Sequence, residues 1–195
     1  MPRLLPSLLA LALLAGAGAW SPAGAAAPDR LALAGGPLAR AGEAVRSLLW
    51  IDLYRVTLYL PESRRPAPPL DQPDLAKAFR VEVLYDGDLP DRIPADWADK
   101  LLPALEPADR LRLKRSYRGL SAGDELLFSF FPGRGTLMEV DGRPVIATRD
   151  DRFMKAIVAL FAGPDATSSQ VREALLRSAS PLLATQRDRA AGHAR

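Results

Sequence analysis

The sequence predicts an α+β domain in which a large, mainly antiparallel sheet carries a layer of helices on one side. Stretches of alternating apolar residues, which are typical of strands, lie in both halves of the 195-residue chain. The Asp141-Gly142 pair separates two such stretches and is a strong hairpin signal. Helical patterns follow groups of strands instead of alternating with single strands, and this order favours an antiparallel sheet.

The first half of the chain is predicted to hold a short strand over 31–35 and a long β-rich stretch over 45–60. The apolar residues of the long stretch change parity, from Leu49, Ile51 and Leu53 to Val56, Leu58 and Leu60. Strand side chains alternate with a period of two, so this change requires an irregularity. We expect a bulge or a turn near Tyr54 and Arg55. The proline-rich residues 62–75 are expected to form an exposed loop.

The remaining segments divide into strands and helices by their apolar period and their boundary residues. Strands are predicted over 79–85, 125–131, 136–140 and 144–147. Helices are predicted over 94–102 and 107–117, from Asp150 to the residues before Gly163, and after Ser168 or Ser169. Proline suits the first turn of the first two helices, and Asp and Ser are good N-cap residues for the last two.

The first 25 residues are predicted to be a signal peptide. Arg3 precedes an apolar run, and Ala23-Gly24-Ala25 resembles an export cleavage site. The run of about 16 residues is shorter than the ~20 that a membrane-spanning helix needs. We therefore expect a periplasmic or secreted protein with no stable membrane span after removal of residues 1–25. The domain is expected over 26–184, followed by a disordered tail over 185–195.

Composition excludes several kinds of chemistry. The chain has no Cys and no Asn, and its one histidine, His193, lies in the expected tail. Disulfides, thiol catalysis and Cys-ligated metals are thereby excluded, and Ser–His catalysis is disfavoured. The net charge of +3 falls to +2 without residues 1–25, whose only charged side chain is Arg3. Such a charge does not favour nucleic-acid binding, and we expect no cofactor and no metal.

Four residues form the candidate ligand-binding set: Arg46, Tyr54, Thr57 and Tyr59. In a straight strand the first two share a face, and the last two rejoin it after the parity change. Such a face can line a cavity that takes an anion, or it can be the solvated side of an antiparallel sheet. A straight strand would separate Arg46 from Tyr54 by about 26 Å. The two can therefore share a small ligand only if the chain turns between them.

Several segments resemble bacterial chalcone isomerase-like proteins. In residues 42–61, GEAVRSLLWIDLYRVTLYLP, a glycine-containing turn and an arginine precede an apolar strand with a Tyr and a Leu-Tyr-Leu pattern. Residues 79–85, residues 123–136, the Asp141-Gly142 turn and residues 153–164 follow in the order and spacing of that family. The resemblance covers roughly residues 31–178.

The resemblance implies an open-faced β-sandwich, with helices layered over a large sheet. In that family the plant enzymes cyclise chalcones without a cofactor, whereas non-enzymatic relatives bind fatty acids through an Arg and a Tyr. The resemblance places Arg46 and Tyr54 in these two roles, with Arg40 as a second candidate for the arginine. The enzymes also use a Tyr and an Asn later in the chain. This chain has no Asn, and its Tyr85 and Tyr117 lie in segments that do not match those motifs.

We therefore expect an exported, non-catalytic protein that binds a fatty acid or a similar acidic amphiphile in a cavity between sheet and helices, with Arg46 at the polar end. An intramolecular isomerase of the chalcone type and a structural or partner-binding protein of the cell envelope are the alternatives. A salt bridge from Arg46 to Asp52 would weaken the first interpretation, because it would neutralise the charge that an anionic ligand needs.

Overall fold

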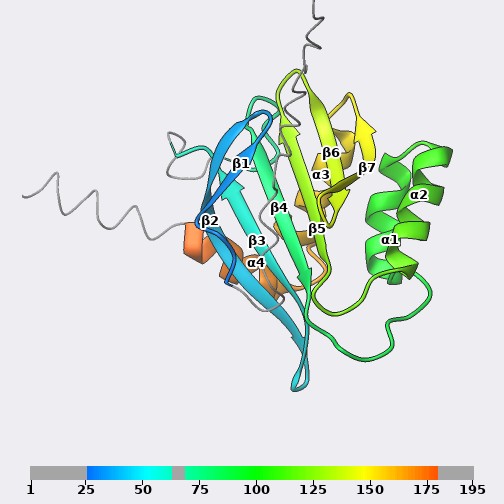
Figure 1. Cartoon of the computed structure of the whole chain (residues 1–195). Helices are drawn as coiled ribbons and strands as arrows, with labels where there is room; N and C mark the ends of the chain where they lie inside the picture. The colour runs from blue at the N-terminus through cyan, green and yellow to red at the C-terminus, as the bar shows by residue number, and fades with distance from the viewer. Residues whose placement is uncertain (1–25, 63–68, 180–195) are drawn as a thin grey trace, which may run out of the picture.

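The computed structural model describes residues 26–62 and 69–179. Its centre is one curled sheet of seven strands, in which each strand pairs antiparallel with the next one in the sequence (Figure 1). The strands are β1 (Arg30–Leu33), β2 (Gly36–Leu48), β3 (Ile51–Leu60), β4 (Lys77–Val83), β5 (Glu125–Phe131), β6 (Gly135–Val140) and β7 (Arg143–Thr148). The expected signal peptide and tail lie outside the described residues.

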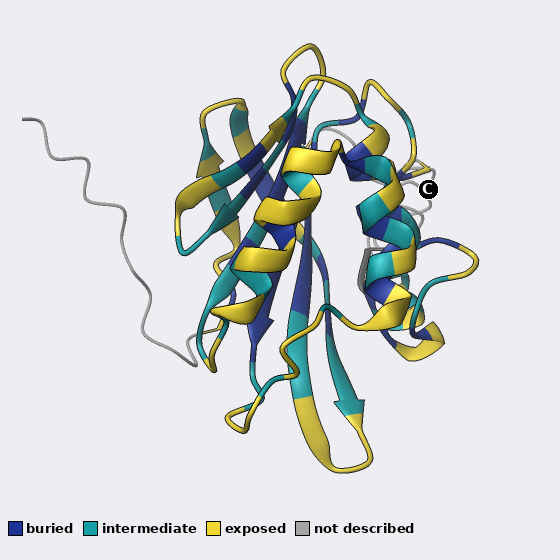
Figure 2. Ribbon diagram, turned by 90° about the vertical axis from the view of Figure 1, so that its right-hand side faces the viewer, coloured by how far each residue is buried: buried dark blue, intermediate teal, exposed yellow. Residues whose placement is uncertain are grey.

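The helices cover one face of this sheet. They are α1 (Ala95–Leu101), the 3-10 helix η1 (Leu102–Ala104), α2 (Pro107–Arg118), α3 (Arg152–Phe161) and α4 (Ser169–Ala179). The main core lies between them and the sheet, where buried residues concentrate (Figure 2). Phe79 of β4 stacks on Phe161 of α3, and Phe128 of β5 meets Phe153 of α3 edge to face. The predicted fold class, an antiparallel sheet with helices on one side, is confirmed.

Most element boundaries agree closely with the local sequence signals, but β2 begins at Gly36, nine residues before the predicted start at 45. The predicted strand over 125–131 is β5, and the predicted helix over 107–117 is α2 with one more residue. The Asp150 carboxylate accepts a hydrogen bond from the Arg152 amide at the start of α3, and the Ser168 hydroxyl accepts one from the Val171 amide at the start of α4. None of the helices in the described part of the chain is long and apolar enough to cross a bilayer.

The long β-rich stretch contains two features, of which the sequence predicted one. The expected irregularity is a bulge at Leu53, an extra residue between the pairs Arg46–Tyr54 and Ser47–Asp52. The unexpected feature is a hairpin: β2 ends at Leu48, the chain reverses at residues 49–50, and β3 begins at Ile51. The straight strand considered for residues 46–54 is therefore wrong.

Gly42 also lies in β2 and not in the turn that the resemblance suggested, because the register shift beside it is a bulge within a continuous strand. A Cβ atom at this position would overlap the backbone carbonyl oxygen of Leu175 in α4. The missing side chain allows α4 to pack directly on β2, with Val171 and Leu175 fully buried. This contact brings the start of α4 close to Arg46.

Candidate functional site

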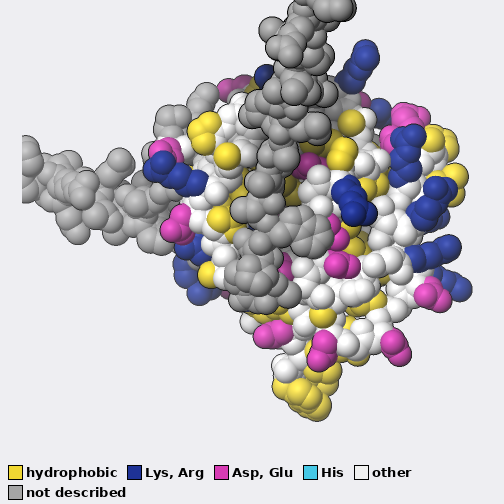
Figure 3. Space-filling model, in the orientation of Figure 1, with side chains coloured by type: hydrophobic (Ala, Val, Ile, Leu, Met, Phe, Trp, Pro, Cys, Tyr) yellow, Lys and Arg dark blue, Asp and Glu magenta, His cyan; other side chains and the backbone are white. Residues whose placement is uncertain are grey.

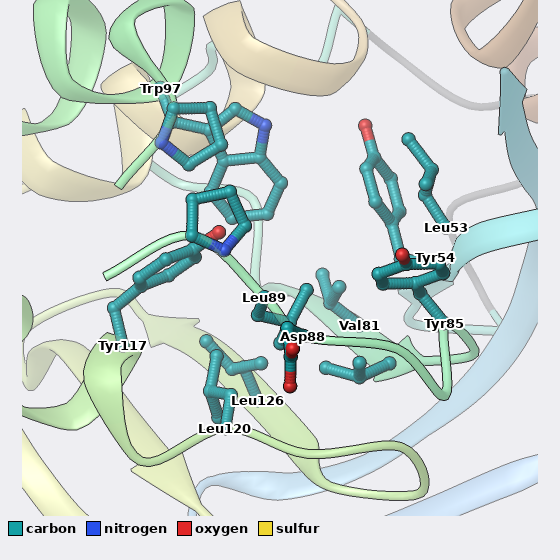
Figure 4. Close-up of a pocket in the computed structure, with 13 residues that line it drawn as sticks. Leu53, Tyr54, Val81, Tyr85, Asp88, Leu89, Trp97, Tyr117, Leu120 and Leu126 are labelled. Atoms are coloured by element: carbon teal, nitrogen blue, oxygen red, sulfur yellow. The ribbon is translucent and has the colours of Figure 1, made fainter. Parts of the chain in front are cut away.

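A pocket of about 350 Å³ lies between the sheet and the helices α1 and α2 (Figure 4). Strands β3, β4 and β5 form its floor, and the loop after β4, α1 and the end of α2 form its walls. The lining residues are Leu53, Tyr54, Val81, Val83, Tyr85, Asp88, Leu89, Pro90, Pro94, Trp97, Tyr117, Leu120 and Leu126. The β3 bulge explains why both Leu53 and Tyr54 reach the pocket, because a bulge redirects neighbouring side chains to one side.

The lining is apolar and aromatic, with three phenol hydroxyls. Three of the four tyrosines in the sequence, Tyr54, Tyr85 and Tyr117, line the pocket together with Trp97. Figure 4 shows these rings around the cavity. The single charged side chain among the described lining residues is Asp88, which is solvent-exposed. Such a surface can hold the hydrocarbon part of a ligand and offer hydrogen bonds to a few of its polar atoms.

The ring of Tyr54 is held in place by other aromatic side chains. Its centroid lies 5.5 Å from that of Trp97 and 6.2 Å from that of Phe161, both edge to face. Burial raises the pKa of Tyr54 above its usual value, although a hydrogen bond with Thr167 and the charge of Arg46 partly oppose the shift. The phenol is therefore neutral at physiological pH and can donate a hydrogen bond to an anion.

Arg46 lies directly across from Tyr54 on the neighbouring strand. Residues in register on adjacent strands project to the same face of a sheet, so Arg46 and Tyr54 share the helix-covered side. The Nη1 atom of Arg46 donates a hydrogen bond to the Ser168 hydroxyl at 3.3 Å. The hairpin at residues 49–50 creates this proximity, and it meets the condition that the chain must turn between the two residues.

The charge of Arg46 is not neutralised within the described chain. No salt bridge joins it to a carboxylate there, and its hydrogen-bond partner is the neutral Ser168. Asp52, the internal partner considered from the sequence, instead accepts a hydrogen bond from the Ser47 hydroxyl at 2.5 Å. A half-buried guanidinium without an anionic partner is a favourable place for a ligand carboxylate.

Thr57 and Tyr59 lie on the opposite face of the sheet, so the expected common face is wrong. They follow Tyr54 by three and five residues, and β3 runs without a register break against β4 over this span. The Thr57 hydroxyl donates to the Glu43 carboxylate at 3.3 Å, and the Tyr59 hydroxyl donates to the Pro28 carbonyl at 3.0 Å. The sheet itself separates these two residues from the pocket.

Arg40, the second candidate for the arginine, also lies on the opposite face. It pairs in register with Tyr59 and forms salt bridges with Asp29 at 2.5 Å and Glu43 at 3.7 Å. Arg46, in contrast, does not line the pocket itself, but it pairs in register with the lining residue Tyr54 and has no carboxylate partner among the described residues.

Sequence reasoning missed most of the pocket lining. The sequence does not single out Trp97 as a site residue, and the segments of Tyr85 and Tyr117 match no motif of the related enzymes. Tyr85 comes from the loop after β4, Trp97 from α1 and Tyr117 from α2. They meet only because α1 and α2 pack over that end of the sheet. The segments around Tyr117 and Trp97 are rich in charged residues, so no local signal in the sequence pointed to a pocket.

The fold and the pocket define an open-faced β-sandwich protein with an apolar, tyrosine-rich cavity beneath its helices. Residues 19–177 match the family model described as chalcone isomerase-like, so the chain belongs to this family. No curated protein matches this sequence. The structure is similar to the crystal structure of a fatty-acid binding protein from Arabidopsis thaliana, with a TM-score of 0.49 and 17% sequence identity, covering 73% of this chain and 88% of that chain.

Proposed function

We propose that the protein binds a fatty acid or a similar acidic amphiphile in the pocket between the sheet and the helices. The hydrocarbon chain lies against the apolar lining, and the carboxylate lies at the end marked by Tyr54 and Arg46. The observation that carries the proposal is the position of Arg46, an un-neutralised cation directly across from a tyrosine that lines an apolar pocket. Thr57 and Tyr59 take no part in this binding mode.

The energetics favour such a ligand. A volume of about 350 Å³ lies at the lower end of the usual range for ligand pockets. Each buried methylene contributes about 0.8 kcal/mol, so the chain supplies most of the affinity. A hydrogen bond to a charged group contributes about 1.5–3 kcal/mol. The exposed carboxylate of Asp88 repels an anionic head group at its part of the lining, which supports the orientation toward Arg46.

The test compares a fatty acid with the fatty alcohol of the same length, measured by calorimetric titration. Wild type should bind the acid more tightly. Arg46→Gln should weaken binding of the acid about 10-fold, because it removes the charge of a half-buried group. Affinity for the alcohol should change less than about twofold, because the apolar contacts remain. Arg134→Gln, at an exposed turn between β5 and β6, is the matched control and should leave both affinities unchanged.

Two outcomes would refute the proposal. One is the absence of any fatty-acid affinity better than millimolar, together with no co-purifying lipid in native mass spectrometry. The other is an equal loss for acid and alcohol in Arg46→Gln, which would assign Arg46 a purely structural role.

A second candidate function, an intramolecular isomerase of the chalcone type, is supported by one observation. Tyr85 and Tyr117 line the same pocket as Tyr54, and phenol hydroxyls can position a phenolic substrate and its water. The chain has no Asn to complete the set that the plant enzymes use. The loss of chalcone absorbance on mixing with the purified protein would detect such an activity. A rate equal to that in buffer would eliminate it.

We also propose that residues 1–25 direct export and that the working protein is periplasmic or secreted. The apolar run after Arg3 and the small residues before position 26 support this proposal. N-terminal sequencing of protein recovered from the expressing cell should give a chain that begins at Ala26. Full-length protein retained in the cytoplasm would contradict it.

A further inference from the structure

The hairpin between β2 and β3 ends in a patch of four consecutive large apolar residues. Leu48, Leu49, Trp50 and Ile51 are 56%, 80%, 84% and 39% exposed. They form the tip that projects at the bottom of Figure 1, and Figure 3 shows it as an uninterrupted apolar group there. Glycine and small polar residues normally occupy such turns, so an exposed apolar tip marks an interaction site.

The backbone at the tip is also unusual. Leu49 has a φ of 57°, in the left-handed region that two-residue hairpin turns normally fill with glycine or asparagine. A bulky residue in this conformation costs free energy. Glycine would relieve the backbone, so the leucine side chain weakens the turn and places an apolar group in water. Both costs are understandable if the side chain is buried when the protein is bound to its partner.

We propose that this hairpin tip inserts into the surface of a lipid bilayer. The tip is convex and narrow, and it ends in Trp50, a residue type that favours the interfacial region of a bilayer, and in Leu49, which is apolar enough to enter the hydrocarbon below it. The segment 48–51 carries no charge that insertion would have to desolvate. A dimer through this tip is disfavoured, because stable interfaces use about 20–30 residues on each side and the tip offers four.

The tip also lies beside the pocket. Leu53 follows Ile51 by two residues, about 7 Å along the strand, and it lines the pocket. The loop after β4 is attached here, because the amides of Leu84 and Tyr85 donate hydrogen bonds to the Leu53 carbonyl. Insertion of the tip therefore brings this end of the pocket close to the lipid. Delivery of the ligand from the bilayer would depend on the proposed function, but docking of the tip to the bilayer does not depend on it.

The absence of cysteine allows a direct test on the full chain. Leu48→Cys carries an environment-sensitive fluorophore at the tip, and Pro132→Cys carries it at the exposed β5–β6 turn, at the other end of the sheet. With phosphatidylcholine vesicles and no added ligand, the emission of the label at position 48 should shift to the blue, and the label at position 132 should not respond. The response should be insensitive to salt, since the tip is uncharged.

Two further variants of the position-48 labelled chain separate insertion from misfolding. Leu49→Gly should fold at least as stably as the parent, because glycine adopts the positive φ of this turn without strain. Trp50→Ser should leave the core intact. Each should raise the lipid concentration for a half-maximal shift about tenfold or more, the effect of losing one buried apolar side chain.

Three results would overturn the inference. The first is that the chain floats with vesicles while the label at position 48 remains in water, which would assign membrane binding to another segment. The second is a blue shift that appears without vesicles as the protein concentration rises, which would show that the tip binds a second copy of the chain. The third is that vesicles of pure lipid do not shift the emission of the label at position 48, whereas a partner protein does. Failure of fatty-acid binding would leave all of these readouts unchanged, so the two proposals fail separately.

Discussion

Replacement of Gly42 by alanine is expected to disrupt the contact between α4 and the sheet. The added Cβ atom would overlap the backbone carbonyl oxygen of Leu175. Rotation of a side chain cannot relieve this overlap, because the oxygen is part of the helix backbone and the Cβ is fixed by the strand. The helix must move away from β2, and it carries with it Ser168, the partner of Arg46.

The buried side chains of α4 set the size of the effect. Val171 and Leu175 are 1% and 0% exposed. A local adjustment to one extra methyl group costs about 1–3 kcal/mol, whereas complete loss of both buried contacts costs about 3–6 kcal/mol. The overlap with backbone prevents an easy adjustment, so Gly42→Ala is expected to lower the free energy of unfolding by about 2–4 kcal/mol, between these limits.

Urea unfolding followed by circular dichroism measures this loss. With a slope of about 2 kcal/mol per M, the midpoint should fall by about 1–2 M. Gly119→Ala is the matched control, because the nearest atom to its Cβ would be the Ser116 carbonyl oxygen at 3.8 Å and its φ is −95°. The control should be neutral or stabilising by up to about 1 kcal/mol. A Gly42→Ala midpoint within about 0.2 M of wild type would refute the close packing of α4 on β2.

Three other substitutions test buried polar groups and the aromatic wall. Burial lowers the pKa of Lys77 to about 8. Between pH 8 and 10 the unfolded chain therefore keeps a proton on Lys77 that the folded protein has lost, and the free energy of unfolding should rise by about 1–3 kcal/mol over this range. Lys77→Met should abolish this rise in urea titrations at several pH values. Glu82→Gln should cost about 2–4 kcal/mol, because the buried carboxylate pairs with Arg55 at 2.5 Å and Arg80 at 3.7 Å; a cost below about 0.5 kcal/mol would show that the pairs are not stabilising. Trp97→Ala should destabilise the protein by about 3–5 kcal/mol and weaken binding of fatty acid and alcohol alike; a selective loss for the acid would contradict the apolar role assigned to this wall.

Local signals in the sequence predicted most elements because the underlying physics acts over a few residues. Alternation of apolar residues identified β4, and Asp150 and Ser168 identified the starts of α3 and α4 to within one residue. The parity change in the long β-rich stretch predicted the β3 bulge within one or two residues, since a strand cannot change faces without one. The hairpin at Leu49 and Trp50 escaped prediction, because neither residue is a usual turn former and Leu49 adopts a positive φ.

The candidate site residues were likewise predicted in part. Arg46 and Tyr54 were named from the sequence, and the unforeseen hairpin brings them together across two strands. Thr57 and Tyr59 were assigned to the wrong face, because the bulge precedes Tyr54 and no second irregularity follows it in β3. A shift of one residue in the position of a bulge reverses the face of every side chain beyond it.

The sequence by itself determined the fold class, the positions of most strands and helices and the absence of cysteine and asparagine chemistry. These follow from composition and from periodicities that each segment carries within itself. Only the tertiary structure decided that Tyr85, Trp97 and Tyr117 line one pocket with Tyr54, and that Arg46 lies beside it without a carboxylate partner in the described chain. Such contacts join residues tens of positions apart, and they depend on how the helices pack over a curled sheet, which no local pattern encodes.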